Sequence, residues 1–160
     1  MTSTADLMDE QPDGVDVCEL QFRQYGAVRQ FSGRVRTVRC LEDNGLLRAV
    51  LAEPGQGQVL VVDGGGSFRT ALLGDMVAGV AVERGWAGIV VNGCVRDVEA
   101  LRRLPIGIKA LGSNPRRSGK AGTGEADMPV AFGGATFVPG QTLTSDEDGV
   151  VVTRPYEPAA

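Results

Sequence analysis

Apolar residues in the middle of the chain form short runs separated by glycines and acidic residues. Two continuous runs, Gln58–Val62 and Gly88–Asn92, predict strands that are buried on both faces of a sheet. The segment between them has a helical period, with apolar residues at Leu73, Met76, Val77, Val80 and Ala81. Gly85 follows the last turn as a C-cap, so the pattern predicts a strand, a helix and a second strand.

The same alternation continues after the second strand. A turn over Gly93–Asp97 leads into a short helix over Val98–Leu104, which Pro105 stops. Ile106–Leu111 is then predicted as a third strand. The middle of the chain is therefore a β–α–β–α–β unit of an α/β protein.

The segments on either side of this unit are predicted to be mainly β. Ahead of it, Ala27–Leu41 is predicted as a strand and Leu46–Glu53 as a helix or a strand. After it, four short stretches predict β segments: Val130–Phe132, Thr136–Val138, Gln141–Thr144 and Gly149–Thr153. The polar first dozen residues suit a short helix or a loose lead-in, and residues 1–14 and 155–160 are expected to be loosely ordered. No internal repeat is visible, so residues 1–160 are interpreted as one domain.

The amino-acid composition restricts the possible chemistry of the protein more than it restricts the possible fold. The chain has 16 basic and 20 acidic residues, a net charge of −4 and no histidine. A mildly acidic domain has no electrostatic footprint for nucleic acid or anionic membranes. Without histidine, catalysis must use carboxylates, arginine, lysine, backbone amides or a hard metal ion bound by oxygen. No signal-peptide pattern or membrane-length apolar run is present, so we expect a cytoplasmic protein.

Polar residues follow both buried strands of the predicted unit. Asp63–Gly66 comes directly after the first strand, and Asn92–Asp97 closes the second. Ligands bind beyond the carboxyl ends of the strands in parallel α/β units. These two segments are therefore the places where the sequence indicates a site.

Gly74–Val77 opens the predicted helix between the two strands. The N–H groups of a first helical turn lack partners within the helix and lie at the positive end of its dipole, so this segment can bind a carboxylate or a phosphate. Asp75 can instead be an ordinary helix cap, and spacing alone favours that simpler interpretation.

Arg96 and Asp97 stand together after the second strand. The arginine can hold a carboxylate through two hydrogen bonds, and the aspartate can present an oxygen to Mg²⁺. The alternative, which spacing alone favours, is that Asp97 caps the next short helix and Arg96 makes an ion pair. Cys94 is interpreted as a small buried residue, because no histidine is present to activate it.

Three further segments carry weaker indications. Asp63–Ser67 is similar to a phosphate or methyl-donor nucleotide loop, but Asn92 stands where such a site needs a second acidic residue. Arg116–Lys120 can grip an anionic substrate, although a mobile, solvated loop is the simpler interpretation. Asp146–Asp148 can ligate a metal ion or form an acidic hairpin turn.

The stretches Asp63–Asp75 and Gly85–Asp97 resemble the RraA-like family, which contains the regulators of ribonuclease E activity and the class II 4-hydroxy-4-methyl-2-oxoglutarate aldolases. Further stretches extend the resemblance over nearly the whole chain: Cys40–Asn44, Lys109–Gly112, Phe132–Gly134, Pro139–Gly140 and Asp146–Gly149. The family divides on an aspartate separated by twenty residues from an Arg-Asp pair. Asp75 and Arg96-Asp97 have that spacing.

This resemblance implies a swivelling β/β/α domain that forms a homotrimer, or a doubled trimer, with sites near subunit interfaces. It implies that Asp97 engages a divalent cation, Mg²⁺ or Mn²⁺, directly or through its waters. It also implies that the pyruvyl end of a small 2-oxo acid is held by Arg96 and by the amides of Gly74, Asp75, Met76 and Val77. Asp75 would be the third catalytic residue.

Such an enzyme is expected to cleave 4-hydroxy-4-methyl-2-oxoglutarate to pyruvate by a retro-aldol reaction and to decarboxylate oxaloacetate. Both reactions leave a pyruvate enolate, whose oxygen a metal ion and Arg96 can stabilise. The alternative is a non-enzymatic inhibitor of an RNA-degrading ribonuclease, for which the sequence marks no docking surface. A quinone methyltransferase has only the glycine-rich loop in its favour. The intact set of Asp75, Arg96 and Asp97 favours the lyase.

Overall fold

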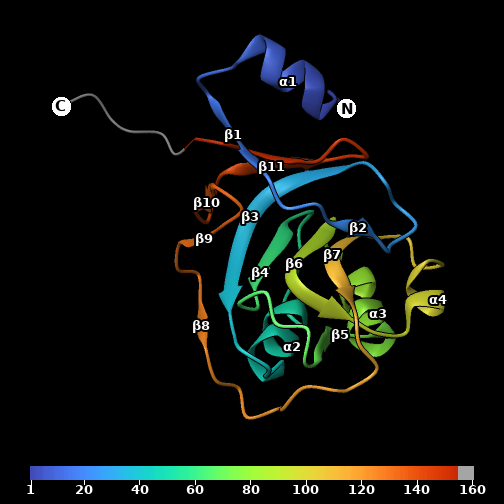
Figure 1. The fold of residues 1–160 in the computed structure, drawn as a ribbon. Coiled ribbons are helices and arrows are strands. Elements are labelled where there is room, and N and C mark those ends of the chain that lie inside the picture. Colours follow the sequence, from blue (N-terminus) through green and yellow to red (C-terminus); the bar gives the residue numbers. More distant parts are fainter. Residues whose placement is uncertain (155–160) are drawn as a thin grey trace.

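The structure is a computed structural model that describes residues 1–154 (Figure 1). Four parallel strands form its centre, in the order β3 (Phe31–Arg39), β4 (Val59–Asp63), β6 (Gly88–Val95) and β7 (Gly107–Ser113). Three helices connect them: α2 (Gly45–Leu51), α3 (Asp75–Glu83) and α4 (Val98–Leu101). The predicted β–α–β–α–β unit is thus β4–α3–β6–α4–β7, and the predicted α/β class is confirmed.

Antiparallel strands extend this central sheet at both edges. Next to β3 lie β11 (Thr142–Ser145), β12 (Val150–Thr153) and β1 (Val15–Cys18), and the short β2 (Arg23–Gln24) pairs with β7. Two more short strands attach to it: β5 (Ala71–Leu73) to β6 and β8 (Glu125–Ala126) to β3. A separate hairpin consists of β9 (Val130–Phe132) and β10 (Ala135–Phe137).

The continuous apolar strands are buried because the sheet has a core on each face. In β4, Leu60 and Val62 belong to the core beneath α2, α3 and α4, whereas Val59 and Val61 belong to the core beneath β9–β12. All four side chains are 0% exposed. Alternate side chains of a strand point to opposite faces, so burial on both faces needs an unbroken apolar run.

The ring of Phe31 fixes the packing at one end of the central strands. A Cβ at Gly88 or at Gly107 would lie 2.3 or 2.0 Å from carbons of that ring. Both glycines start their strands and pair with each other in register. The ring therefore occupies the space that two side chains would otherwise need, and lies flat against the backbone of β6 and β7.

The first residues of the chain form a short helix, which is one of the two interpretations that the sequence left open, rather than a loose lead-in. Helix α1 covers Thr4–Glu10, and the hydroxyl of Ser3 caps it by accepting a hydrogen bond from Asp6 N–H. The buried carboxylate of Asp146 accepts bonds from the N–H and hydroxyl of Thr4, at 2.8 and 2.7 Å. A buried carboxylate is costly unless it is hydrogen-bonded, so these two bonds hold α1 against the segment that carries Asp146. The expectation for residues 155–160 lies outside the described residues.

The predicted turn over Gly93–Asp97 is also corrected. Strand β6 continues to Val95, because Cys94 and Val95 pair with β7 on one side and with β5 on the other after a register shift. Arg96 and Asp97 consequently sit directly at the carboxyl end of β6. In the part of the chain that the structure describes, no helix is long and apolar enough to cross a membrane.

Candidate functional site

The carboxyl end of β6 and the start of α3 are held together by backbone pairing. The N–H of Arg96 donates to the carbonyl of Leu73, the last residue of β5, at 2.9 Å. Helix α3 begins two residues after Leu73, so β5 places the start of α3 beside the Arg96-Asp97 pair. Asp97 itself has a left-handed backbone, with φ of 57°, which aspartate tolerates better than most residues.

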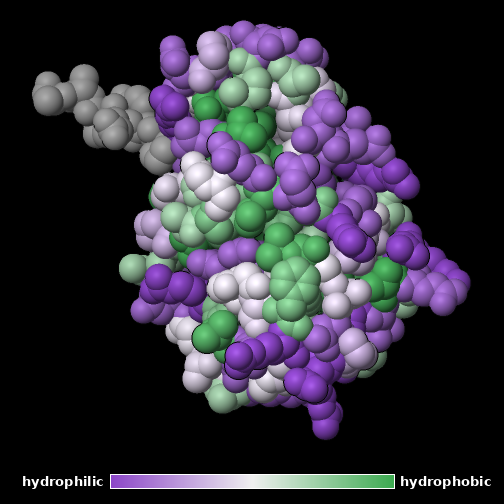
Figure 2. Space-filling model, in the orientation of Figure 1, coloured by the Kyte–Doolittle hydropathy of each residue, from purple (hydrophilic) through white to green (hydrophobic). Residues whose placement is uncertain are grey.

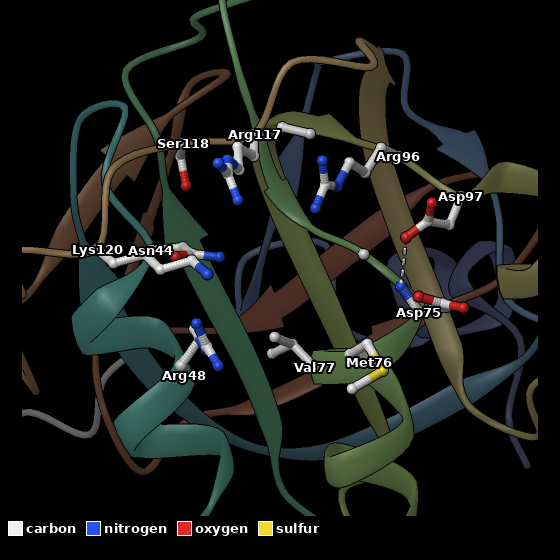
Figure 3. A pocket seen from close by; sticks show the side chains of 12 residues that line it. Asn44, Arg48, Asp75, Met76, Val77, Arg96, Asp97, Arg117, Ser118 and Lys120 are labelled. Atoms are coloured by element: carbon white, nitrogen blue, oxygen red, sulfur yellow. Dashed lines mark hydrogen bonds between the residues drawn. The ribbon is translucent and has the colours of Figure 1, made fainter.

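Asp97 caps a helix, but not the helix that the spacing suggested. Its side chain makes no capping bond to α4, which it precedes. Its Oδ2 instead accepts a hydrogen bond from Asp75 N–H, the first residue of α3, at 3.1 Å. Gly74 permits this approach, because a Cβ there would lie 2.6 Å from the same oxygen. The Asp75 carboxylate is exposed and lies at the edge of a pocket (Figure 3).

The three predicted catalytic residues line one pocket of about 200 Å³. Figure 3 shows Asp75 and Asp97 at one side of it and the guanidinium of Arg96 pointing into its middle. The predicted substrate-binding residues Gly74, Met76 and Val77 line the same pocket. The structure thus brings together every residue that the sequence assigned to the site.

Four basic side chains line this pocket: Arg48, Arg96, Arg117 and Lys120. The ion pairs within residues 1–154 involve five other arginines, namely Arg29, Arg36, Arg39, Arg103 and Arg154. Arg96 therefore makes no ion pair in the described chain, so the alternative prediction, in which Arg96 pairs with an acidic residue, is wrong. Its Nη1 donates to the carbonyl of Pro115 at 3.5 Å. Together the four cations give the pocket a positive potential suited to an anionic ligand.

The Arg116–Lys120 loop is exposed at four of its five residues, as expected of a solvated loop, but hydrogen bonds within it and directly after it tie it to the rest of the fold. The buried carboxylate of Asp43 accepts bonds from the N–H groups of Ala121 and Gly122, at 2.7 and 2.9 Å. Burial raises the pKa of Asp43, but these bonds and one from Gly45 N–H outweigh burial and hold the pKa below its ordinary value. The carbonyl of Arg116 also accepts a bond from Ala71 N–H at 2.7 Å. The loop can therefore hold Arg117, Ser118 and Lys120 at the pocket.

The glycine-rich loop after β4 has a structural role. Oδ1 of Asp63 accepts hydrogen bonds from Asn92 Nδ2 and from Gly65 N–H, both at 3.0 Å. A Cβ at Gly64 would lie 2.8 Å from the carbonyl oxygen of Asn92. The glycines thus let this loop pack against β6, and the Asp63 carboxylate is used inside the loop. Nothing in this geometry favours a methyl-donor site.

The acidic segment Asp146–Asp148, the last of the weaker candidates, and the buried Cys94 also have structural roles. Asp146 holds α1 and accepts a bond from Asp148 N–H at 3.0 Å, while Glu147 pairs with Arg29 at 2.6 Å, so the acidic segment is a hairpin turn between β11 and β12. Cys94 is 0% exposed, and burial raises the pKa of its thiol, so it is a packing residue.

The pocket offers a partial set of ligands for a divalent cation. Within residues 1–154, no three His, Cys, Asp or Glu side chains gather as a metal site. The pocket's carboxylates are those of Asp75 and Asp97. One or two carboxylates, with water and substrate oxygens in the remaining positions, are how proteins commonly bind Mg²⁺. Oδ2 of Asp97 accepts the bond from Asp75 N–H, which leaves Oδ1 available as a ligand for a cation. The residues present therefore fit such an ion.

A family model for RraA-like proteins, described as Aldolase/RraA, matches residues 4–152. The chain belongs to the RraA-like family. The RNA-processing inhibitor RraA from Thermus thermophilus is 48% identical, with a TM-score of 0.93 over 99% of this chain and 97% of that one. RraAS2 of Streptomyces coelicolor, an unusual member of the RNase ES inhibitor RraA protein family, is 30% identical, with a TM-score of 0.79 over 96% of this chain and 80% of that one.

A third RraA-like structure has a different name. A protein from Geobacillus kaustophilus described as S-adenosylmethionine: 2-dimethylmenaquinone methyltransferase is 47% identical, with a TM-score of 0.94 over 97% of this chain and 96% of that one. The family contains aldolases and ribonuclease inhibitors, so membership alone does not assign an activity.

Sequence reasoning missed two polar residues that line this pocket, Arg48 and Asn44. Asn44 precedes α2 and its Nδ2 donates to the carbonyl of Leu72 at 3.1 Å, which ties α2 to β5. Asn44 belongs to Cys40–Asn44, one of the stretches that resemble the family, so the resemblance could have indicated it as a site residue. Arg48 lies in α2, a segment whose secondary structure the sequence left open, and its spacing gave no signal.

Proposed function

We propose that this RraA-like protein is a divalent-metal-dependent lyase that forms a pyruvate enolate. It would cleave 4-hydroxy-4-methyl-2-oxoglutarate to pyruvate by a retro-aldol reaction and decarboxylate oxaloacetate. The observation that carries the proposal is the meeting of three groups in one pocket. These are the guanidinium of Arg96, the first turn of α3 and the carboxylate of Asp97, held 3.1 Å from the Asp75 N–H.

The first turn of α3 supports binding of the substrate's carboxylate. The first hydrogen bond within the helix runs from Ala78 N–H to the carbonyl of Gly74, at 3.0 Å. The N–H groups of Met76 and Val77 precede that bond, so they are the donors that an α-helix leaves for an anion. Asp75 N–H is already bonded to Asp97. We assign the pyruvyl carboxylate to Met76 and Val77 N–H, beside Arg96.

Arg96 and the two aspartates would then perform the chemistry. The guanidinium of Arg96 donates to the oxygen on which negative charge develops when the C3–C4 bond breaks. One oxygen of Asp97 would hold a Mg²⁺ or Mn²⁺ ion, and the chemistry that such an ion would supply is Lewis-acid activation of the C2 carbonyl. The carboxylate of Asp75 takes the proton from the C4 hydroxyl through a water molecule. Decarboxylation needs no base to start the bond cleavage. In both reactions C3 of the enolate must then take up a proton to give pyruvate, and the water molecule beside Asp75 would supply it.

A pyruvate-release assay tests the proposal. With Mg²⁺ or Mn²⁺, the wild-type protein should release pyruvate from both acids, and EDTA should abolish turnover reversibly. Arg96→Ala should lose turnover and keep its fold, whereas Arg29→Ala, which removes an exposed arginine outside the pocket, should keep both. Wild-type protein that releases no pyruvate from either acid with either metal would overturn the lyase assignment.

A second candidate function is inhibition of an RNA-degrading ribonuclease. Its support is the 48% identity to an RNA-processing inhibitor from Thermus thermophilus. Inhibition would depend on a docking surface rather than on the pocket. The two functions separate in one experiment, because inhibition of a purified RNase E-type nuclease should survive Arg96→Ala and Asp97→Ala, while pyruvate release should not.

We further propose that the protein is a homotrimer, or two trimers together. An apolar surface beside the pocket supports this: Met76 is 82% and Val80 37% exposed, and both line a shallow depression with Ala49, Ala52 and Val77. A second copy that covers this surface would adjoin the pocket, because Met76 and Val77 line both. Light scattering should give three or six chain masses for the wild type and a smaller mass for Met76→Glu.

A further inference from the structure

We infer that Arg48 and Arg117 form a second anion subsite, which holds a carboxylate at the end of the substrate away from Arg96. The inference rests on the proposed function for the position of the reacting end. It makes these two arginines the residues that select 2-oxo dicarboxylates over 2-oxo monocarboxylates.

The arrangement of charges in the pocket is asymmetric. Figure 3 shows Asp75 and Asp97 at one side, with Arg96 next to Asp97. Arg117 lies beside Arg96, and Arg48 faces them from α2 at the side away from the two aspartates. An ion held by Asp97 would neutralise carboxylate charge only at the first side. The opposite side is left with an excess of positive charge.

Neither arginine of this subsite is engaged elsewhere in the described chain. The ion pairs of residues 1–154 include five arginines, and Arg48 and Arg117 are not among them. Guanidinium groups that point into one small pocket repel each other, and an anion bound between them offsets this repulsion because it attracts both. Guanidinium is also the group best matched to a carboxylate, through two parallel hydrogen bonds.

The backbone segments that carry both arginines are tied to their neighbours before any ligand binds, while the two side chains themselves are exposed. Arg117 belongs to the loop that Asp43 anchors through the N–H groups of Ala121 and Gly122, and a backbone bridge pairs Arg117 with Ala71. Arg48 lies in α2, whose start is tied to β5 by the bond from Asn44 to Leu72. Anchoring of this kind lowers the ordering cost of binding, which is what a built subsite requires.

The size of the pocket limits the size of the substrate. At about 200 Å³ it is smaller than the pockets that take drug-sized ligands. It suits a small acid with a carboxylate at each end, one beside Arg96 and the other between Arg48 and Arg117. Oxaloacetate and 4-hydroxy-4-methyl-2-oxoglutarate fall within this class, and 4-hydroxy-2-oxopentanoate, which lacks the far carboxylate, does not.

Substitution by methionine removes the charge and keeps a long, unbranched side chain. For Arg48→Met and Arg117→Met we expect kcat/KM to fall roughly tenfold or more with the dicarboxylates, mostly through KM. The fall with 4-hydroxy-2-oxopentanoate should be clearly smaller. Arg29→Met, outside the pocket, is the matched control and should leave both values unchanged. An equal fall with both kinds of substrate, or no fall with either, overturns the inference.

A binding experiment separates this inference from the lyase assignment. Succinate and butyrate, which have the same number of carbons, are titrated without metal, and the Kd of each is measured by calorimetry. Succinate should bind the wild type more tightly than butyrate, and Arg48→Met should abolish the difference. If this holds while no pyruvate is released from any acid, the lyase assignment fails and the subsite stands. If succinate binds no better than butyrate, or if inorganic phosphate displaces succinate at lower concentration, the carboxylate subsite is overturned.

Discussion

The Asp97 carboxylate and the Asp75 N–H are joined by a hydrogen bond of 3.1 Å between the end of β6 and the start of α3. One oxygen of Asp97 is thereby used to orient the side chain, which lines the pocket, and the second oxygen is left for a ligand. The same bond satisfies one of the N–H groups that a helix leaves without a partner. A single carboxylate therefore positions the helix that we assign to substrate binding and the cation that we assign to catalysis.

Replacing Asp97 should separate its two roles. Asp97→Asn keeps an oxygen for Asp75 N–H and tolerates the left-handed backbone, so its thermal midpoint should stay within a few degrees of wild type. It lacks the charge that binds a cation, so pyruvate release should fall roughly 100-fold or more. Asp97→Ala should lose the same activity and also about 1 kcal/mol of stability. An Asp97→Asn protein with the wild-type rate would show that this carboxylate does not serve the metal ion.

Gly74→Ala should reduce activity while leaving the fold nearly unchanged. The new Cβ would lie 2.6 Å from Oδ2 of Asp97, and that carboxylate can move because it is the end of a side chain. We expect turnover to fall roughly tenfold through this displacement, with unfolding free energy changed by less than about 1 kcal/mol.

Gly79→Ala is the matched control on the same helix. A Cβ at Gly79 meets nothing within 4 Å, so the protein should keep its activity and gain about 0.5–1 kcal/mol from the lower entropy of its unfolded chain. Equal activity for the two variants would show that the fit of Gly74 against Asp97 is unimportant.

Asp43→Ala should weaken substrate binding from outside the pocket. It removes the acceptor for Gly45, Ala121 and Gly122 N–H, so the loop that carries Arg117 loses its anchor. KM should rise, by roughly tenfold, with a smaller change in kcat, because Arg96 and Asp97 are untouched. Hydrogen exchange should show faster exchange at Ala121 and Gly122 N–H. Unchanged exchange at these amides would contradict the role that we give to Asp43.

Asp146 should make the attachment of α1 sensitive to acid. Burial raises the pKa of its carboxyl, but the bonds from Thr4 and from Asp148 N–H outweigh burial and hold the pKa below its ordinary value of 3.8. A carboxyl whose pKa is lowered by folding stabilises the fold above its unfolded pKa, and this stability is lost as pH falls through the folded pKa. Acidification below pH 3.8 should therefore release α1.

The comparison with Asp146→Asn isolates this effect. At neutral pH the variant should unfold at a lower temperature than wild type, and the difference should narrow below pH 3.8. Thermal unfolding of the wild type and the variant between pH 3 and 7 measures this difference in unfolding temperature. A difference that stays constant over this range would show that the Asp146 charge does not hold the helix.

The central unit could be predicted because its signals are local. The continuous apolar runs of β4 and β6 and the helical period of α3 each lie within one segment, and their order dictates a parallel sheet with helical connections. The expectation of a site beyond the carboxyl ends of β4 and β6 followed from that order, although β6 ends at Val95 and not at Asn92. The family resemblance joined Asp75, Arg96 and Asp97 into one site, where spacing alone favoured separate helix caps.

What could not be predicted depends on contacts between distant segments. Thr4 and Asp146 are 142 positions apart, so nothing local distinguishes an anchored α1 from a loose end. Gly93 and Cys94 look like turn residues, yet pairing on both sides keeps them in β6. Arg48 reaches the pocket only because α2 is placed beside α3, which no pattern within α2 states.

The contact of one ring with two glycines has an evolutionary consequence. Phe31 lies where Cβ atoms of Gly88 and Gly107 would otherwise be, so the three positions share one volume. A mutation at either glycine is expected to be harmful unless the aromatic residue is exchanged for a smaller one in the same lineage. Across RraA-like sequences the identities at these three positions should therefore be inherited together, as one unit of variation rather than three.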